Sequence, residues 1–151
     1  NHGLTAKPCS TADNPLPGGG RVVNASELEE MGDIQSERLA RVYGAEAVDV
    51  VTRAARGGLV SAEVEQAVLK EGALRLEDYW ARRSSRAWFD EDAGLPVLEE
   101  AANRMADLLG WDDARKALEI ENCYQIDRAS RAGFLESTGC EDVSDDCRAA
   151  G

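Results

Sequence analysis

The chain has 151 residues, and its 29 acidic and 17 basic side chains give it a formal net charge of −12. That charge excludes nucleic acid as a partner, because binding to it depends on Lys and Arg contacts to phosphate, and it excludes an anionic membrane surface in the same way. Apolar residues make up 43 % of the sequence and aromatic residues only 5 %, while the abundant Ala, Leu, Glu and Arg favour helices.

Residues 1–32 are predicted to form an extended linker. They lack the periodicity of a helix or a strand, and they carry all but one of the four prolines and the run Gly18-Gly19-Gly20. Proline restricts the backbone at its own and the preceding position, whereas glycine relaxes it. The few apolar anchors of the linker are expected at Leu4, Leu16, Val22 and Val23.

Two helices are predicted next, over 33–43 and 45–55, with Gly44 in a left-handed conformation between them. A third helix is predicted over 61–83, capped by the serine at its first position. Gly72 lies inside this helix, where glycine costs up to about 1 kcal/mol relative to alanine. We expect it to mark a kink or a close contact between helices.

The segment 84–94 is predicted to connect two helices, with Trp88 and Phe89 as a short apolar plug. Helix 95–109 follows, and its apolar residues recur at i, i+3, i+4 and i+7, the pattern of an amphipathic helix. Pro96 falls in the first turn of that helix, where a missing N–H is harmless. The predicted core stripe comprises Leu95, Leu98, Ala101, Ala102, Met105, Leu108 and Leu109.

The residues Gly110, Trp111 and Asp112 are predicted to form a structural corner between two helices. Glycine suits a left-handed helix end, and Trp111 can fold back onto the last turn as in a Schellman motif. Asp112 can then cap the following helix, predicted over 113–132. The anchors of that last helix are expected to be Leu118, Ile120, Tyr124 and Ile126.

The predicted elements make an all-α protein. We expect a small multi-helix bundle of about five helices over residues 33–135, preceded by the extended linker 1–32. Residues 136–151 are small and acidic, so they are predicted to be a flexible tail.

No residue is assigned to catalysis, to a cofactor or to a metal. His2 is the only histidine, and it lies at the terminus without a plausible partner for base catalysis. No Ser–His or Cys–His pair is therefore expected, and a metal site of His and Cys ligands lacks support. The glycines at 18–20 lack the preceding strand and following helix of a dinucleotide fingerprint. The four cysteines show no CxxC pairing and no disulfide spacing, which indicates a reducing cytoplasm, and Cys123 is expected to be a small core residue.

One cluster of charged residues is singled out, namely Arg82, Arg83 and Arg86, because it concentrates positive charge in an acidic chain. Asp78 lies four residues before Arg82, on the same face of a helix, so local ion pairing is one interpretation. The other is that these guanidinium groups make interdomain contacts with carboxylates of another domain. Both interpretations stay open at the level of sequence.

Four motifs occur in a characteristic order and spacing. They are Pro15-Leu16-Pro17-Gly18-Gly19, Leu39-Ala40-Arg41-Val42-Tyr43-Gly44, Leu76-Glu77-Asp78 with Ala81-Arg82-Arg83, and Leu109-Gly110-Trp111-Asp112. Together they resemble the C-terminal helical domain of FAD-dependent (aerobic) glycerol-3-phosphate dehydrogenases. The first motif is similar to the junction that follows the FAD-binding part of those enzymes, and the third resembles their long helix.

The resemblance implies a parent flavoenzyme that oxidises sn-glycerol 3-phosphate to dihydroxyacetone phosphate, with FAD accepting the hydride and quinone receiving the electrons. FAD and substrate would bind the missing part of the parent, so this chain alone is expected to be inactive. Its expected partner is the missing FAD-binding domain of the same polypeptide. The parent is expected in the cytoplasm, or peripheral at the inner face of the cell membrane. The chain begins with Asn1 and not Met, which fits a piece of a longer polypeptide.

Two alternatives accompany this hypothesis. One is a free-standing acidic helical module for protein interaction that shares only the helix pattern. The other is the same domain in an oxygen-using glycerol-3-phosphate oxidase. A flavin-binding sequence upstream in the gene would favour the flavoenzyme domain over the free-standing module, and a start codon there would favour the module. Peroxide production by the full-length protein would favour the oxidase over the dehydrogenase.

Overall fold

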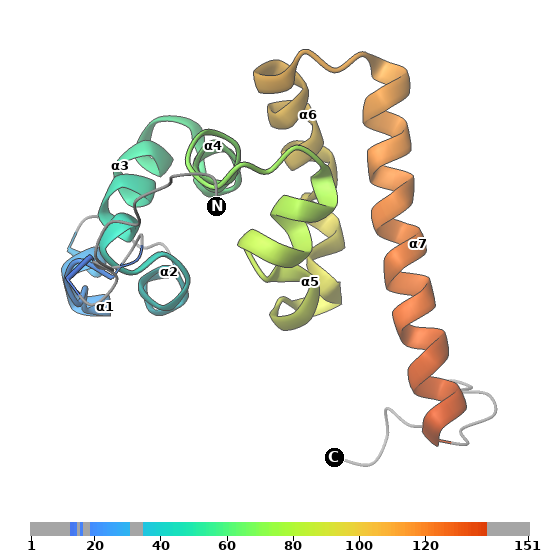
Figure 1. The fold of residues 1–151 in the computed structure, drawn as a ribbon, viewed down its shortest axis with the longest axis horizontal. Coiled ribbons are helices and arrows are strands. Elements are labelled where there is room, and N and C mark those ends of the chain that lie inside the picture. The colour runs from blue at the N-terminus through green and yellow to red at the C-terminus, as the bar shows by residue number, and fades with distance from the viewer. Residues whose placement is uncertain (1–12, 15, 17–18, 31–34, 139–151) are drawn as a thin grey trace, which may run out of the picture. The chain divides into compact units, whose positions relative to one another are not determined.

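The computed structural model describes residues 13–14, 16, 19–30 and 35–138, with side chains through Ala132. These residues contain seven α-helices, short 3-10 and π-helical segments, and no strand (Figure 1). The all-α prediction is therefore confirmed. The two helices beyond the five expected, α1 and α5, lie in stretches that were predicted to be connections. The chain divides into two compact units, Asn1–Gln66 and Ala67–Gly151.

The first unit contains α2 (Ser36–Tyr43), α3 (Ala47–Gly57) and most of α4 (Leu59–Leu69). Gly44 follows α2 with φ 53° and ψ −129°, a positive-φ backbone that glycine adopts without a Cβ clash but that lies outside the predicted left-handed helical region. Apolar positions spaced i, i+3, i+4 and i+7 turn one face of α3 into the core. The buried residues of this core are Val23, Leu28, Leu39, Tyr43, Ala47, Val50, Val51, Ala54 and Ala62.

A short helix, α1 (Ala25–Glu29), lies within the stretch predicted to be an extended linker. Its Leu28 is completely buried in the core of the first unit, which gives this stretch a reason to fold against the unit. Among the expected linker anchors, Val23 is buried, whereas Leu16 and Val22 are 80 % and 83 % exposed. Leu4 lies outside the described residues.

A buried carboxylate links α4 to α2. Glu63 is completely buried, and its Oε1 accepts a hydrogen bond from Arg38 and another, 3.2 Å long, from the hydroxyl of Tyr43. The Arg38 side chain is itself only 19 % exposed. The attraction between the two ions offsets the cost of removing them from water, so the loss of one partner leaves an uncompensated buried charge.

The single helix predicted over 61–83 is wrong. Helix α4 begins at Leu59, and it ends at Leu69. Gly72 follows with a φ of 71°, and a left-handed residue cannot continue a right-handed helix. The N–H of Ala73, which lies beyond this end of α4, donates at 2.8 Å to the carbonyl of Ala67 in the last turn of the helix. Helical structure later resumes in a π-helical segment, Asp78–Arg83.

The apolar plug predicted at Trp88 and Phe89 is also wrong. Both residues belong to α5 (Arg86–Phe89) and are 58 % and 83 % exposed. Trp80 fills the core instead, with 1 % exposure, and its Nε1 donates to the carbonyl of Ala93 at 2.7 Å. A buried indole whose N–H has a backbone partner is a stable core residue.

Helix α6 (Leu98–Leu109) follows a 3-10 segment, Glu91–Val97, which holds Leu95 and Pro96. The helix therefore begins later than predicted. Its core stripe is confirmed at the centre, where the residues spaced i, i+3, i+4 and i+7 are all buried. These residues are Leu98, Ala101, Ala102 and Met105.

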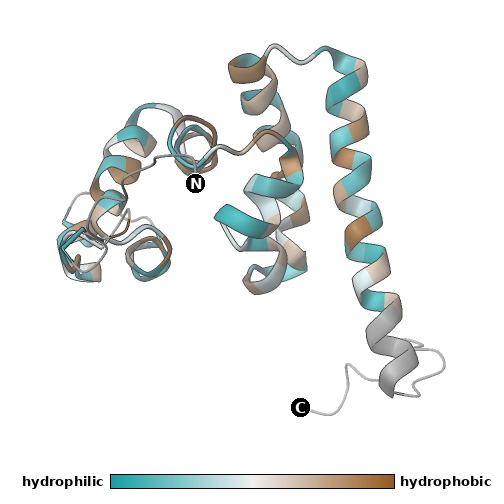
Figure 2. Cartoon of the chain, in the orientation of Figure 1, coloured by the Kyte–Doolittle hydropathy of each residue, from teal (hydrophilic) through white to brown (hydrophobic). Residues whose placement is uncertain are grey.

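Helix α7 (Asp113–Thr138) packs beside α6 (Figure 1). Apolar and polar bands alternate along it in Figure 2. Leu118 and Tyr124 are 52 % and 37 % exposed, so they are not the anchors that the sequence predicted, while Ile120 and Ile126 are half-buried. Residues 136–138 of the predicted tail belong to this helix, and 139–151 lie outside the described residues.

The buried face of α7 consists of Glu119 and Cys123, one turn apart. Glu119 is 2 % exposed, its Oε2 accepts the N–H of Leu76 at 2.9 Å, and its Oε1 lies 2.5 Å from the guanidinium of Arg115. This carboxylate therefore ties α7 to the connection that follows α4. Cys123 is completely buried, which confirms its prediction as a small core residue.

The outer part of α7 carries ion pairs of its own. Arg128 lies 2.6 Å from Glu121, and Arg131 lies 2.9 Å from Asp127. Hydrogen bonds from Arg128 and then from Gln125 lower the pKa of Glu121 below its usual value. Exposed pairs of this kind each contribute little to stability, since water and salt screen them.

Arg38→Gln is expected to lower the free energy of unfolding by about 3–5 kcal/mol, because it removes the charge of Arg38 beside the buried carboxylate of Glu63. Arg41→Gln is the matched control on the same helix. Arg41 pairs with Glu37 in water, where the two side chains are 76 % and 73 % exposed, so this change is expected to have little effect. Urea unfolding of the two variants measures the difference, and equal losses would contradict the role of the buried pair.

Candidate functional site

Arg82, Arg83 and Arg86 lie on two short helical pieces of the second unit. The first two end the π-helical segment, and the third begins α5. The wide π turn is closed by Ser84, whose N–H and hydroxyl both donate to the carbonyl of Tyr79 at 2.9 Å. A π turn adds one residue to a helical turn and is frequent at functional sites. The structure thus presents two arginines on an unusual turn.

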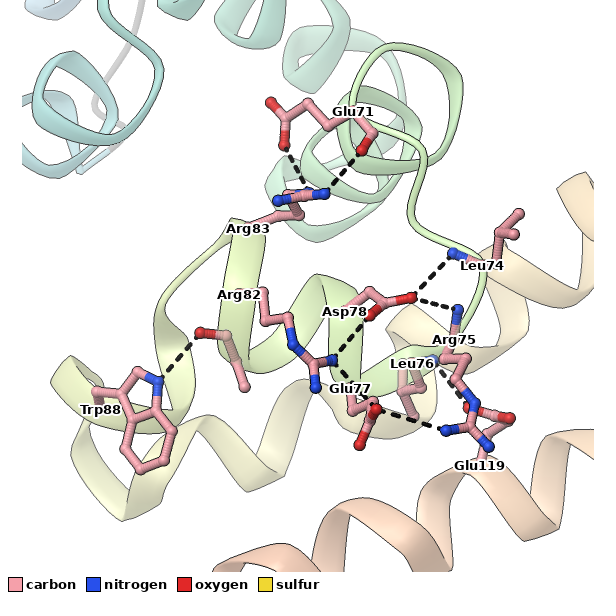
Figure 3. Close-up of polar contacts among 11 residues, drawn as sticks. Glu71, Leu74, Arg75, Leu76, Glu77, Asp78, Arg82, Arg83, Trp88 and Glu119 are labelled. Atoms are coloured by element: carbon pink, nitrogen blue, oxygen red, sulfur yellow. Dashed lines mark hydrogen bonds and ion pairs between the residues drawn. The ribbon is translucent and has the colours of Figure 1, made fainter.

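Arg82 is held by two carboxylates. Its Nη1 lies 3.1 Å from Glu77 and 2.8 Å from Asp78, and the side chain is still 56 % exposed (Figure 3). The hydrogen bond and charge of Glu77, followed by those of Asp78, raise the pKa of Arg82 above its usual value. The ion pair between Asp78 and Arg82 at i, i+4 is therefore present, and it leaves the guanidinium at the surface of the unit.

Asp78 also organises the connection before it. Its Oδ2 accepts the N–H of Leu74 at 3.2 Å and the N–H of Arg75 at 3.1 Å, as Figure 3 shows. These bonds satisfy two backbone donors that precede a helical turn, which is the task of a capping carboxylate. Oδ1 of the same side chain pairs with Arg82, so one carboxylate both caps the connection and positions the arginine.

Arg83 reaches back to the end of α4. Its Nη2 donates to the carbonyl of Glu71 at 3.0 Å, and its Nε lies 3.9 Å from the carboxylate of the same residue (Figure 3). The side chain is 41 % exposed. A guanidinium that binds a terminal carbonyl stabilises a helix end, so Arg83 fixes the start of the connection that Asp78 closes.

Arg86 differs from the other two because it is only 4 % exposed, and its guanidinium pairs with Asp90 on the next turn. Gly94 packs directly against it: a Cβ on Gly94 would lie 2.8 Å from the Cβ of Arg86. Arg82 and Arg83 therefore lie at the surface, whereas Arg86, the first residue of α5, is buried.

The corner Gly110-Trp111-Asp112 joins α6 to α7. Gly110 has φ 70° and ψ 35°, and the N–H of Trp111 donates to the carbonyl of Ala106 at 3.1 Å, the long bond of a Schellman motif. Oδ1 of Asp112 accepts the N–H of Arg115 at 2.7 Å, which is an N-cap bond. The indole of Trp111 is half-buried, and the guanidinium carbon of Arg115 lies 5.9 Å from the centre of the ring.

Sequence analysis assigned Glu119 no buried role, although its Oε2 accepts the N–H of Leu76 from the side of α7. Its only signal in the sequence is Arg115, one helical turn earlier. A shallow groove of about 340 Å³ opens between the connection that precedes Asp78 and α7, and it is lined by Arg75, Glu77, Asn122, Gln125, Ile126 and Ala129. Its two charged groups, Arg75 and Glu77, lie on the same wall and are 3.5 Å apart, so the groove has no preference for one ligand charge.

The described residues offer little reactive chemistry. Burial raises the pKa of Cys123 to about 12, and the nearby charge of Glu119 adds to the shift, so this thiol stays protonated and is a poor nucleophile. No group of three His, Cys, Asp or Glu side chains in the described part of the chain is placed to hold a metal ion. None of the helices in that part combines the length and the apolar content of a bilayer span. His2 lies outside the described residues.

Comparison with known proteins gives two matches. The family model of the C-terminal domain of alpha-glycerophosphate oxidase matches residues 9–116, a range that includes the arginine cluster and the corner. The probable mitochondrial glycerol-3-phosphate dehydrogenase of Dictyostelium discoideum is 32 % identical over 134 residues, which cover 79 % of this chain and 21 % of that protein. The chain therefore spans about one fifth of the length of this curated relative. No solved structure matches.

Two glycines of the second unit allow a matched prediction. Gly94 and Gly110 have φ values of 62° and 70°, so Gly→Ala costs about 1–2 kcal/mol at either position from backbone strain. A Cβ at Gly110 meets nothing within 4 Å, whereas one at Gly94 would clash with Arg86. Gly94→Ala is therefore expected to cost at least about 1 kcal/mol more than Gly110→Ala. Urea unfolding compares them, and the reverse order would refute the close packing of Arg86.

The thiol of Cys123 is expected to resist alkylation. Iodoacetamide at pH 9 should leave it unmodified in the native chain and modify it after unfolding, as peptide mass mapping would report. The native pKa of about 12 exceeds the ordinary value of 9.0, so the native state keeps its proton where the unfolded state loses it. Stability should accordingly fall as the pH rises from 9 to 12. Cys123→Ala should make the stability fall less steeply with pH. An unchanged slope would contradict the raised pKa of Cys123.

Proposed function

The chain belongs to the family of the C-terminal domain of alpha-glycerophosphate oxidase, and we propose that it is a non-catalytic helical domain of a larger flavoenzyme. The match over residues 9–116 carries this proposal. The small share of the Dictyostelium relative that the chain covers supports it, because four fifths of that protein lie outside the region of similarity. The proposed role is to brace the catalytic part of the same polypeptide.

The parent enzyme is proposed to oxidise sn-glycerol 3-phosphate to dihydroxyacetone phosphate, with FAD as the hydride acceptor and quinone as the final acceptor. The name of the relative, a glycerol-3-phosphate dehydrogenase, supports this choice. The family description names an oxidase, which favours the second candidate, an enzyme that passes its electrons to oxygen.

The described residues do not fit FAD. A dinucleotide site needs a strand that leads into a glycine-rich turn and a helix, whereas the described residues fold as helices and turns. We therefore derive no flavin chemistry through them and assign FAD and substrate to the remainder of the parent. The parent is proposed to lie in the cytoplasm, with any membrane association arising from its other parts.

The contact with the catalytic part is proposed to use Arg82 and Arg83. Both are paired locally, yet their side chains are 56 % and 41 % exposed, so their guanidinium groups can also meet carboxylates of a neighbouring domain. Arg86 is excluded from this role because its side chain is buried. The alternative of a free-standing acidic interaction module predicts that no flavin-binding sequence precedes the chain.

Expression of the complete gene product tests the proposed function. We expect the purified protein to carry a yellow flavin and to reduce a quinone analogue when glycerol 3-phosphate is added. The isolated chain is the control and should show neither property. Stoichiometric peroxide in place of quinone reduction would select the oxidase, and a gene product without flavin would reject the proposal.

A further inference from the structure

Helix α5 exposes two aromatic side chains next to each other. Trp88 is 58 % exposed and Phe89 is 83 % exposed, in a chain that contains only three Trp, three Tyr and two Phe. The other tryptophans behave differently, since Trp80 is 1 % exposed and Trp111 is half-buried. Exposed apolar residues are ordinary when single, but an adjacent aromatic pair marks a candidate contact surface.

The aromatic pair is presented on a rigid support. Trp88 donates from its Nε1 to the carbonyl of Ala81 at 3.0 Å, so the indole is fixed against the π-helical segment (Figure 3). Ser85, just before α5, has a left-handed φ of 59°, and Gly94 packs against Arg86 underneath the helix. Such strained and close-packed backbone persists only where surrounding structure holds it. The indole of Trp88 is thus preorganised, which lowers the entropic cost of binding.

Arg82 extends this surface, because it lies on the same segment that accepts the bond from Trp88. Both of its carboxylate contacts use Nη1, and the side chain stays 56 % exposed. Tryptophan and arginine are the residues most often found at the energetic centre of protein interfaces, with near-neutral contacts around them. We call Trp88, Phe89 and Arg82 the aromatic surface.

We propose that the aromatic surface docks onto the catalytic part of the parent polypeptide. This inference rests on the proposed function, and it assigns the contact to named side chains. The matching face would offer an apolar pocket for Phe89 and Trp88 and a carboxylate for Arg82. An acidic chain with a net charge of −12 favours such a protein face over an anionic lipid surface.

The size of the surface selects a tethered partner. A large aromatic residue buries roughly 150–250 Å² in full, so the exposed fractions of Trp88 and Phe89, 58 % and 83 %, leave about 200–350 Å² to be buried, whereas a stable complex of separate proteins needs about 800 Å² on each partner. A partner on the same polypeptide needs far less, because the linkage holds it at an effective concentration in the millimolar range. The family name places this domain at the C-terminal end of an oxidase, so the remaining polypeptide provides that tether.

Hydroxyl-radical footprinting with mass spectrometry tests the proposal on the complete gene product and on the 151-residue chain. Oxidation of Trp88 and Phe89 is expected to fall at least fivefold in the complete protein. Tyr124 and Leu118, which are exposed on α7, are the internal controls and should be oxidised equally in both. Unchanged oxidation of Trp88 and Phe89 would overturn the proposal.

Other occupants give different results. Protection that requires phosphatidylglycerol vesicles would indicate a membrane contact, and protection of the 151-residue chain that grows with its concentration would indicate a second copy. Either result overturns the proposal. The flavin content and glycerol 3-phosphate oxidation of the same preparation are measured in parallel. An active flavoprotein without protection refutes only this inference, whereas a protein without flavin refutes the proposed function.

A double variant, Trp88→Ser with Phe89→Ser, provides a second readout. The change removes the hydrogen bond from Trp88 to Ala81, which contributes about 1 kcal/mol, so the melting temperature of the 151-residue chain should fall by only about 2–4 °C. In the complete protein, the same change should separate one thermal transition into two, as the domain uncouples from its neighbour. The control variant, Leu118→Ser with Tyr124→Ser, should keep a single transition. Identical behaviour of the two variants would contradict the proposal.

Discussion

The second unit depends on carboxylates that bind backbone N–H groups. The connection between α4 and the π-helical segment has no regular structure of its own, and its donors are satisfied by Asp78 from one side and by Glu119 from the other. Glu119 sits on α7, 43 residues beyond Leu76 in sequence. One buried side chain therefore joins this connection to α7, and Arg115 balances its charge.

Most polar side chains in the described part of the chain take part in contacts that hold the fold together. The carboxylates serve as caps or as partners of arginines, the one described thiol is buried, and the arginines at the surface already have local partners. What distinguishes the second unit is the rigid presentation of Trp88 beside Arg82. Because the same acidic groups that hold Arg82 also shape the connection, the surface and the fold of this unit share one set of interactions.

The sequence predicted the elements whose signals are local. The apolar spacing of α6, the glycine between α2 and α3 and the burial of Cys123 all follow from pattern and backbone preference, and the motif order indicated the family that the comparison identifies. Leu39 to Gly44, one of those motifs, coincides with the end of α2.

The failures have a common cause, which is tertiary contact. Gly72 was expected within a helix, but its left-handed backbone ends α4 nearby, and propensity could not tell a kink from a terminus. Trp88 was expected to be an apolar plug, but it is 58 % exposed, whereas Trp80 is buried and its Nε1 reaches the carbonyl of Ala93. The face of α7 was misread since a carboxylate, and not an apolar residue, is its main buried group. No local rule assigns a buried role to Glu119.

The contacts that hold the two parts of α7 differ in their sensitivity to ionic strength. Near Glu119 and Cys123 the helix is fixed by burial, which dissolved ions hardly screen. Farther on, its side-chain support comes from exposed pairs such as Arg128 with Glu121, whose attraction fades once the Debye length shrinks from about 10 Å at 0.1 M to about 3 Å at 1 M salt. Concentrated electrolyte would therefore weaken the exposed pairs of this helix and leave the contacts of Glu119 and Cys123 in place.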